Sequence, residues 1–463
     1  MSAHRPLSFL GSDDLPPMTR PNYIAELQQI LPWGIVIGVV EASMVSIVAS
    51  KTFDASPLLT TVIWAVPILM NVLNPAWAAI LRGRRRRPAF LLIAGCGLVG
   101  VGSVGLTSAD WRPWGGWIFA GQIAFTYLFI SGLITLRTTI WRANYPVTHR
   151  GRIAARLQSV QLFLTLATTL TLSLVYNHQP GVYRVVYPAA AIIGACSLWP
   201  VRRWRMRGEE QELHRYRQYM AQLNHGRTTS RLGLRAGVWE AVSILRTDRR
   251  YASYMLAQFL LGSANFFTDP ILVNAFTKDL QFDYFSSQAL LQLIPSVVLL
   301  LCIHRWAAFF DRVGLMRFRV YNSAAWVASY VLGTAGMLAV AWGGPGALGL
   351  ALPLLVLSRV FNGLGSAGGK IAWSLGHLYY AREHQTELYM GIHVGLTGVR
   401  GLTMPLLGLW TQQLFGYGAL LIAVALGLTA HLLFHRMEAQ DAARAAAAQS
   451  AMPPATPAPE TMV

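Results

Sequence analysis

A series of apolar runs, each about twenty residues long, recurs along nearly the whole chain and most constrains its fold. A helix of about that length crosses the hydrocarbon core of a bilayer. Of the 463 residues, 54% are hydrophobic and only 13% are charged. A soluble domain is about a quarter charged. The sequence therefore predicts an all-α integral membrane protein.

We expect 12 transmembrane helices in two pseudo-symmetric halves of six, joined by a long polar linker. The expected parts are a cytoplasmic N-terminal tail (1–28), an N-terminal half (29–201), a linker (202–250), a C-terminal half (251–437) and a disordered, Ala/Pro-rich tail (438–463). The expected helices cover 30–52, 57–80, 88–107, 115–137, 157–177, 183–201, 251–275, 284–303, 317–342, 347–375, 387–412 and 415–435.

The formal charge of +18 comes largely from arginines in the connectors between apolar runs. Connectors after even-numbered helices are rich in arginine, as in the run from Arg84 to Arg87, whereas those after odd-numbered helices carry few. By the positive-inside rule, both termini and the linker are expected in the cytoplasm, with the chain multi-pass in the inner membrane. The same distribution argues against a nucleic-acid partner. No signal-peptide core precedes the first run, so that run is expected to direct insertion.

No enzyme site emerges from the sequence. It contains no HExxH, no serine nucleophile elbow and no carboxylate pair at catalytic spacing. Cys96, Cys196 and Cys302 lie in or beside apolar runs without metal-ligand spacing, so we interpret them as core residues. We expect no cofactor and no metal, with a proton or ion gradient as the source of energy.

Two connectors six helices apart resemble each other: WAAILRGRRRRPAF at 77–90 and WAAFFDRVGLMRFR at 306–319. Paired six-helix units with a binding site between them are a transporter architecture. The second connector is similar to the signature loop G-x-x-x-D-R-x-G-R-R of the major facilitator superfamily of secondary transporters. This resemblance covers residues 25–437 and implies alternating access, with a gating loop formed by Asp311, Arg312, Gly314 and Arg317.

The first connector departs from that signature, because it keeps the basic run but has no aspartate. In the family, this aspartate latches the outward-facing state. The 142–156 connector, RANYPVTHRGRIAAR, is similar to the family's Tyr-Pro…Arg-Gly turn. The expected helix 157–177 lacks the glycine/proline-rich motif of proton-driven drug exporters, which disfavours a drug/proton antiporter.

Charged and polar side chains form a stripe on the expected helix 347–375, at steps of seven, four and seven residues. The next run continues the pattern. Ionisable residues inside a membrane are expensive and mark solute or ion pathways. Snorkelling to the interface is the alternative for those near the helix end. The members are Arg359, Ser366, Lys370 and His377, with Asn362 and Ser374 beside them, followed by His393, Thr397 and Arg400.

Glu41 lies near the middle of the first run, in GIVIGVVEASMVSIV. A carboxylate there must be protonated or paired, so it is a structural ion pair, a proton-coupling group or a substrate contact. The family resemblance implies that helices 1, 4, 7 and 10 line the central cavity. Further cavity candidates are Gln122, Gln258 and Asn265, ahead of Thr126, Tyr127, Asp269, Gln288 and Gln292, because single polar residues often only join helices.

The stretch GLGSAG at 363–368 matches a dinucleotide fingerprint by letter. That fingerprint requires a strand before it, whereas this stretch lies inside an expected helix. Small residues there are expected to let two helices approach closely.

These patterns predict a monomeric secondary transporter, surrounded by membrane lipids, for a small organic solute coupled to protons. The excess of Arg359, Lys370 and Arg400 over Glu41 favours an anionic or zwitterionic solute. Two alternatives stay open. The first is an exporter of a metabolite or drug. The second is a non-transporting sensor or scaffold, in which the linker binds a partner or anionic lipid headgroups.

Overall fold

The structure is a computed structural model that describes residues 11–81, 83–225, 234–381 and 386–450. Within these ranges all regular elements are helices, as the sequence predicts. Ten helical stretches in the described part are long and apolar enough to cross a membrane. The last of them, Tyr389–Arg444, contains two helices, and Pro57–Leu73 is a shorter apolar stretch. The chain is therefore a multi-pass, all-helical membrane protein.

Contacts between helices divide the chain into two compact units. Unit 1 comprises Met1–Trp239, Asn265–Ser296 and Val394–Ala419. Unit 2 comprises Glu240–Ala264, Val297–His393 and Leu420–Val463. The units do not coincide with the sequence halves 29–201 and 251–437, since three helices of the second half contribute residues to both.

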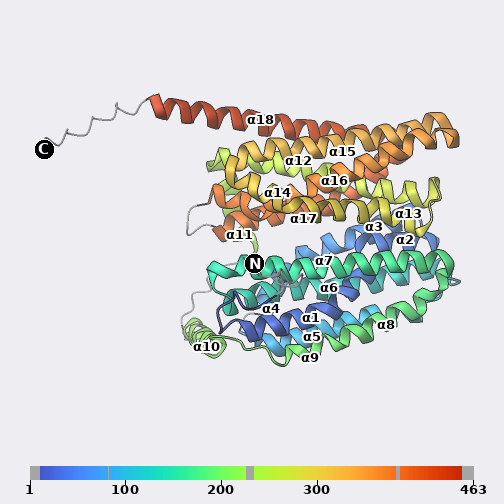
Figure 1. Ribbon diagram of the computed structural model, residues 1–463. Helices are drawn as coiled ribbons and strands as arrows, with labels where there is room; N and C mark the ends of the chain where they lie inside the picture. The colour runs from blue at the N-terminus through green and yellow to red at the C-terminus, as the bar shows by residue number, and fades with distance from the viewer. Residues whose placement is uncertain (1–10, 82, 226–233, 382–385, 451–463) are drawn as a thin grey trace, which may run out of the picture. The chain divides into compact units, whose positions relative to one another are not determined.

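Unit 1 is formed mainly by the blue to green helices of Figure 1, which run alongside one another in that view. Its core is apolar and includes Val36, Ile47, Phe90 and Phe119, all fully buried. The helices that begin in this unit are α1 (Arg20–Val39), α2 (Ala42–Lys51), α3 (Pro57–Leu69), α4 (Asn74–Leu81), α5 (Arg86–Ser103), α6 (Trp114–Asn144), α7 (Val147–His178), α8 (Tyr183–Cys196), α9 (Leu198–Val201), α10 (Glu209–His225), α11 (Leu234–Thr247), α13 (Tyr284–Gln288) and α14 (Ile294–Val313).

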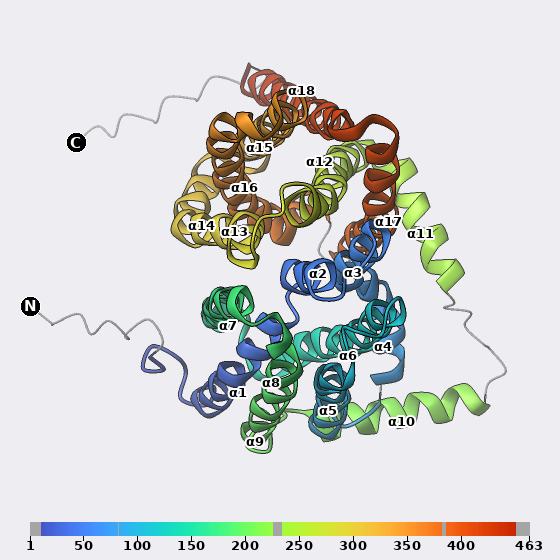
Figure 2. The same ribbon diagram turned by 90° about the vertical axis from the view of Figure 1, so that its right-hand side faces the viewer.

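Unit 2 is built around α15, which packs against α16 and α18. Figure 2 shows these three helices nearly end-on and next to one another. Helices α12 and α17, like α14, contribute residues to both units. The remaining bounds are α12 (Arg249–Asn274), α15 (Leu315–Gly343), α16 (Leu348–Leu375), α17 (Thr386–Phe415) and α18 (Leu420–Ser450).

The glycines of α16 allow this close packing. A Cβ atom on Gly365 would lie 2.7 Å from the ring of Trp326 on α15. The side-chain amide of Asn322 donates a 2.8 Å hydrogen bond to the Gly365 carbonyl oxygen. The GLGSAG stretch is therefore a helix-packing element, as the sequence predicts.

The tails differ from the sequence expectation. The first helix begins at Arg20, inside the segment 1–28 expected to be a tail, and α18 continues to Ser450, inside the tail expected to be disordered. The composition explains the second difference, because the stretch AARAAAA consists of strong helix formers. Within unit 2, Arg250 forms an ion pair with Asp441, which also holds this end of α18.

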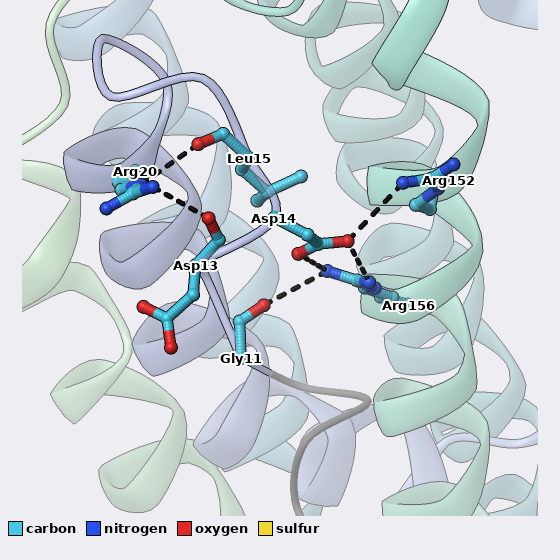
Figure 3. Close-up of polar contacts among 7 residues, drawn as sticks. All are labelled: Gly11, Asp13, Asp14, Leu15, Arg20, Arg152 and Arg156. Atoms are coloured by element: carbon cyan, nitrogen blue, oxygen red, sulfur yellow. Dashed lines mark hydrogen bonds and ion pairs between the residues drawn. The ribbon is translucent and has the colours of Figure 1, made fainter.

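The segment before α1 is folded onto the start of α7 (Figure 3). Arg156 donates hydrogen bonds of 2.9 and 2.6 Å to the two carboxylate oxygens of Asp14 and one of 3.0 Å to the Gly11 carbonyl. Arg152 lies 3.4 Å from the same carboxylate. These bonds tie the residues before the first helix to the first turns of α7.

Candidate substrate and coupling site

The first transmembrane helix is interrupted at Glu41, where the sequence predicts a continuous helix over 30–52. Helix α1 ends at Val39 and α2 begins at Ala42. The backbone of Glu41 (φ −58°, ψ 140°) is non-helical, and its carboxylate accepts hydrogen bonds from the backbone N–H groups of Ser43 at 2.9 Å and Met44 at 3.1 Å. These N–H groups have no partner within the helix, so Glu41 acts as the N-cap of α2.

Residues from two other elements complete this interruption. The hydroxyl of Tyr127 on α6 donates a 2.6 Å hydrogen bond to the carbonyl of Val40, a group that the break leaves without a helical partner. The hydroxyl of Ser43 contacts the Glu41 carboxylate and lies 3.1 Å from Oε1 of Gln288 on α13. The Gln288 amide nitrogen lies 3.5 Å from the Glu41 carboxylate. Both Tyr127 and Gln288 are second-rank candidates in the sequence, yet they directly support the break.

Glu41 is half-buried, whereas Ser43 and Gln288 are buried. Its carboxylate therefore has defined hydrogen-bond donors and remains partly accessible. This environment suits either the ionised form, which only accepts hydrogen bonds, or a protonated form, which donates one.

The other candidates in unit 1 have different surroundings. Gln122 joins α6 to the end of α5, because its amide donates to the Ser103 carbonyl at 2.9 Å and its oxygen accepts from Thr107 at 3.0 Å. Asn265 is half-buried. Arg400 is buried, with its guanidinium 5.3 Å from the centre of the Phe266 ring and 3.1 Å from the Thr397 hydroxyl.

In unit 2, burial separates the members of the helical stripe. Arg359 and Asn362 on α16 are only 3% and 8% exposed, whereas Lys370, further along the helix, is exposed. The Arg359 guanidinium lies 3.4 Å from the hydroxyl of Ser358, which itself donates to the Ser329 carbonyl on α15. His393 is buried against Trp373, with ring centroids 5.5 Å apart.

Gln258 belongs to a buried cluster whose central residue the sequence analysis does not single out. Arg319 on α15 is 1% exposed and donates hydrogen bonds to the side-chain oxygens of Asn322 at 2.8 Å and Gln258 at 2.5 Å. Its guanidinium also lies 4.4 Å from the centre of the Phe434 ring. In the sequence, Arg319 stands beside Arg317 in an arginine-rich connector, so nothing local distinguishes a buried arginine from an exposed one.

A second buried cluster of polar side chains is also not indicated by any sequence pattern. Glu26 on α1 is 2% exposed and accepts hydrogen bonds from the indole of Trp141 at 2.6 Å and the hydroxyl of Tyr145 at 2.7 Å. One turn away on α1, Gln29 accepts from Arg137 at 2.8 Å. Glu26 and Gln29, in the segment expected to be a tail, therefore belong to a packed part of α1.

The gating-loop residues lie where α14 meets α15. Gly314 has φ +76°, a left-handed conformation that favours glycine, and it directly precedes α15. Asp311, Arg312 and Arg317 are exposed. In the matching connector of unit 1, Gly83 has φ +73°, so the two connectors share a glycine turn of the same hand.

The connector between α4 and α5 obtains from α10 the acidic partners that its own sequence lacks. Arg85 forms an ion pair with Glu210 at 2.8 Å, and Arg86 pairs with Glu212. The backbone N–H of Arg86 donates to Glu209 at 2.7 Å. Three glutamates of the linker helix thus contact the arginine run.

The chain is thus a multi-pass helical membrane protein whose first long helix is interrupted at a carboxylate. No protein-family model matches the sequence, and no curated protein matches it. Solved structures do match. They include a mutant of the nucleoside transporter NupG, with TM-score 0.63 and 14% identity, covering 91% of this chain and 99% of that chain.

Two further structures have similar scores. A POT family transporter in complex with 5-aminolevulinic acid gives a TM-score of 0.63 at 15% identity, covering 93% of this chain and 97% of that chain. The xylose transporter XylE from E. coli, in an inward-open conformation, gives 0.59 at 14% identity, covering 90% and 95%. At this level of sequence identity, the structural similarity shows a shared fold. The chain has the fold of the major facilitator transporters, as the sequence resemblance predicts.

Proposed function

We propose that this chain is a secondary transporter of 12 helices that moves a small organic solute across the inner membrane by alternating access. Two observations support the helix count: Tyr389–Arg444 contains both α17 and α18, and Pro57–Leu73 adds a shorter apolar stretch to the ten spans. The arginine-rich connectors support cytoplasmic termini through the positive-inside rule.

The observation that carries this proposal is the break in the first transmembrane helix at Glu41. Secondary transporters bind solutes and coupling ions at discontinuous helices, where backbone groups and helix ends are available inside the membrane. Here a carboxylate occupies the N-terminal end of α2, where the helix dipole favours negative charge. We assign to Glu41 the coupling of proton movement to solute movement.

The hydrogen bonds around Glu41 suggest how a proton changes the site. When ionised, the carboxylate accepts from the N–H groups of Ser43 and Met44. When protonated, the carboxyl group can donate to the Ser43 hydroxyl, which in turn donates to the side-chain oxygen of Gln288. Proton uptake therefore rearranges the contacts that hold α2 to α13.

Two buried arginines support an anionic or zwitterionic solute. Arg359 and Arg400 are 3% and 6% exposed, and an arginine side chain stays charged in proteins. Arg359 belongs to unit 2 and Arg400 to unit 1, and either guanidinium suits a carboxylate or phosphate. Lys370 and His393 take a secondary place in this proposal.

The test begins with a thermal-shift screen of the purified protein against metabolite pools, since a ligand stabilises the state that binds it. The solute identified is then followed into proteoliposomes with an imposed pH gradient. We expect Glu41→Gln to abolish proton-driven accumulation while leaving solute exchange intact. Glu438→Gln on α18 is the control and should behave as wild type. Normal proton-driven accumulation in Glu41→Gln contradicts the coupling role.

Solute recognition is tested separately. Arg359→Gln and Arg400→Gln should each weaken solute binding by roughly tenfold or more, as expected when one partner of a charge-assisted contact is lost. Lys370→Gln, at an exposed position on the same helix as Arg359, should have a smaller effect. Wild-type affinity in both arginine variants contradicts the assignment of an anionic or zwitterionic solute.

A further inference from the structure

The connector between α4 and α5 in unit 1 lies beside two adjoining cavities that the proposed transport does not use. The first has a volume of about 370 Å³ and lies between this connector, α6 and α10. Its charged lining consists of three arginines and two glutamates: Arg84, Arg86, Arg142, Glu209 and Glu212.

The second cavity is an apolar groove of about 340 Å³ between α4, α5 and α6. Leu81 and Arg84 line both cavities, so the groove continues into the first cavity. The apolar lining includes Trp77, Ile80, Leu92, Ile93, Cys96 and Phe129.

The walls of the groove are fixed by packing. The indole nitrogen of Trp77 donates a 3.0 Å hydrogen bond to the Leu128 carbonyl on α6. The Trp77 ring packs against Gly132, where a Cβ atom would approach it to 2.9 Å. Leu92 and Ile80 are 67% and 47% exposed, so this groove has an apolar, open side.

Arg84 is the cation without a partner at the junction of the two cavities. Its neighbours Arg85 and Arg86 are paired with Glu210 and Glu212 of α10. The Arg84 side chain is exposed and has no hydrogen bond or ion pair with any residue that the structure describes. The two glutamates that line the first cavity, Glu209 and Glu212, both contact Arg86, so the charge left at the junction is that of Arg84.

We propose that this place binds one anionic phospholipid, with its phosphate at Arg84 and an acyl chain in the groove. A cation at the end of an open apolar groove is complementary to a molecule that joins an anion to a hydrocarbon chain. By the positive-inside rule the arginine-rich connectors face the cytoplasm, and the cytoplasmic leaflet carries anionic headgroups. The bound lipid contacts α4, α5 and α6 together and so holds the connector that α10 also holds. This inference stands independently of the solute and of proton coupling.

The full-length protein is purified, depleted of lipid and titrated with phospholipids that carry brominated acyl chains, which quench nearby tryptophans. A Leu92→Trp variant adds a reporter at an exposed edge of the groove. Dibrominated phosphatidylglycerol should quench the added fluorescence at a lower concentration than dibrominated phosphatidylethanolamine. In the reporter background, Arg84→Gln should raise the half-saturating phosphatidylglycerol concentration roughly fivefold, the effect expected for one arginine at an anionic headgroup.

Arg436→Gln is the matched control, because Arg436 is an exposed arginine on α18, outside both cavities. It should leave the half-saturating concentration unchanged. Glycerol phosphate, which lacks acyl chains, tests for a soluble phosphate ligand and should not compete. The proposal is overturned by equal affinity for the two lipids, by an unchanged titration in Arg84→Gln, or by full competition from glycerol phosphate.

Discussion

The hydroxyl of Tyr127 donates a 2.6 Å hydrogen bond to the carbonyl oxygen of Val40, across α6 and the end of α1. Val40 is fully buried and directly precedes the helix break at Glu41. A helix interrupted inside a membrane requires partners for the backbone groups that it frees. Tyr127 supplies one of these partners from another helix, so packing between helices of unit 1 stabilises the break.

Removal of this hydroxyl should destabilise the protein. Tyr127→Phe leaves the Val40 carbonyl without its donor, at a cost of about 1–3 kcal/mol in the free energy of unfolding. Chemical unfolding in detergent measures the loss. Tyr321→Phe is the control, because Tyr321 is 52% exposed on α15. Equal effects of the two substitutions would show that the bond to Val40 contributes nothing.

The attachment of the N-terminal segment to α7 should depend on pH. The hydrogen bond from Arg156 lowers the pKa of Asp14 to about 2, from an ordinary value of 3.8. A lowered folded-state pKa means that the contribution is fully present above about pH 4 and is lost as the pH falls through about 2. The carboxylate is 41% exposed, so solvent and salt should weaken the effect.

Hydrogen exchange of residues 11–19, corrected for the intrinsic exchange rate and compared between pH 6 and about pH 2, measures this attachment. Asp14→Asn should increase exchange at pH 6 and remove most of the pH dependence. Asp13→Asn is the matched control, because Asp13 contacts Arg20 through its backbone oxygen. Wild-type protection in Asp14→Asn would exclude the ion pair as the anchor.

The packing of α10 against the α4–α5 connector should require a residue without a side chain at position 83. This residue has φ +73°, and a Cβ atom there would collide with the ring of Tyr216 on α10. Gly83→Ala should therefore displace α10 and expose it to trypsin at Arg215 and Arg217. Gly208→Ala separates the two causes, since Gly208 has φ +66° but open space around it. If both substitutions increase cleavage equally, backbone strain alone explains the result.

The buried Arg319 should be energetically coupled to Gln258. Arg319→Met leaves the Gln258 and Asn322 oxygens without their donor and should lower the free energy of unfolding by about 1–3 kcal/mol. The double variant Arg319→Met/Gln258→Leu also removes the side-chain oxygen to which Arg319 donates and should recover part of that loss. A double-mutant cycle measured by chemical unfolding gives the coupling energy. Strictly additive effects would mean that the pair does not interact.

Part of the candidate site is readable from the sequence. Glu41 is a candidate because a carboxylate in an apolar run is costly, which is evident from its neighbours in the chain alone. Arg359 and Arg400 stand out for the same reason and are buried in the structure. Lys370, on the same helical stripe, is exposed, because helical spacing gives direction around an axis and not burial against other helices.

Other features required the packed structure. The break at Glu41 depends on partners from α6 and α13, since the residues on either side of it, VVEASMV, contain neither proline nor glycine. The role of Gln258 depends on Arg319, 61 residues further along the chain. The family signature points to an aspartate in the connector itself, whereas the structure supplies acids from α10, more than a hundred residues away.

The sequence by itself determined that the chain is helical and that it crosses a membrane repeatedly. These properties follow from hydropathy over about twenty consecutive residues, which is local information. Only the tertiary structure decided which polar groups meet: Glu41 with Gln288, Arg319 with Gln258, and Arg85 with Glu210. Each pair joins residues far apart in the chain, and a buried polar group takes its partner from whichever helix packs against it.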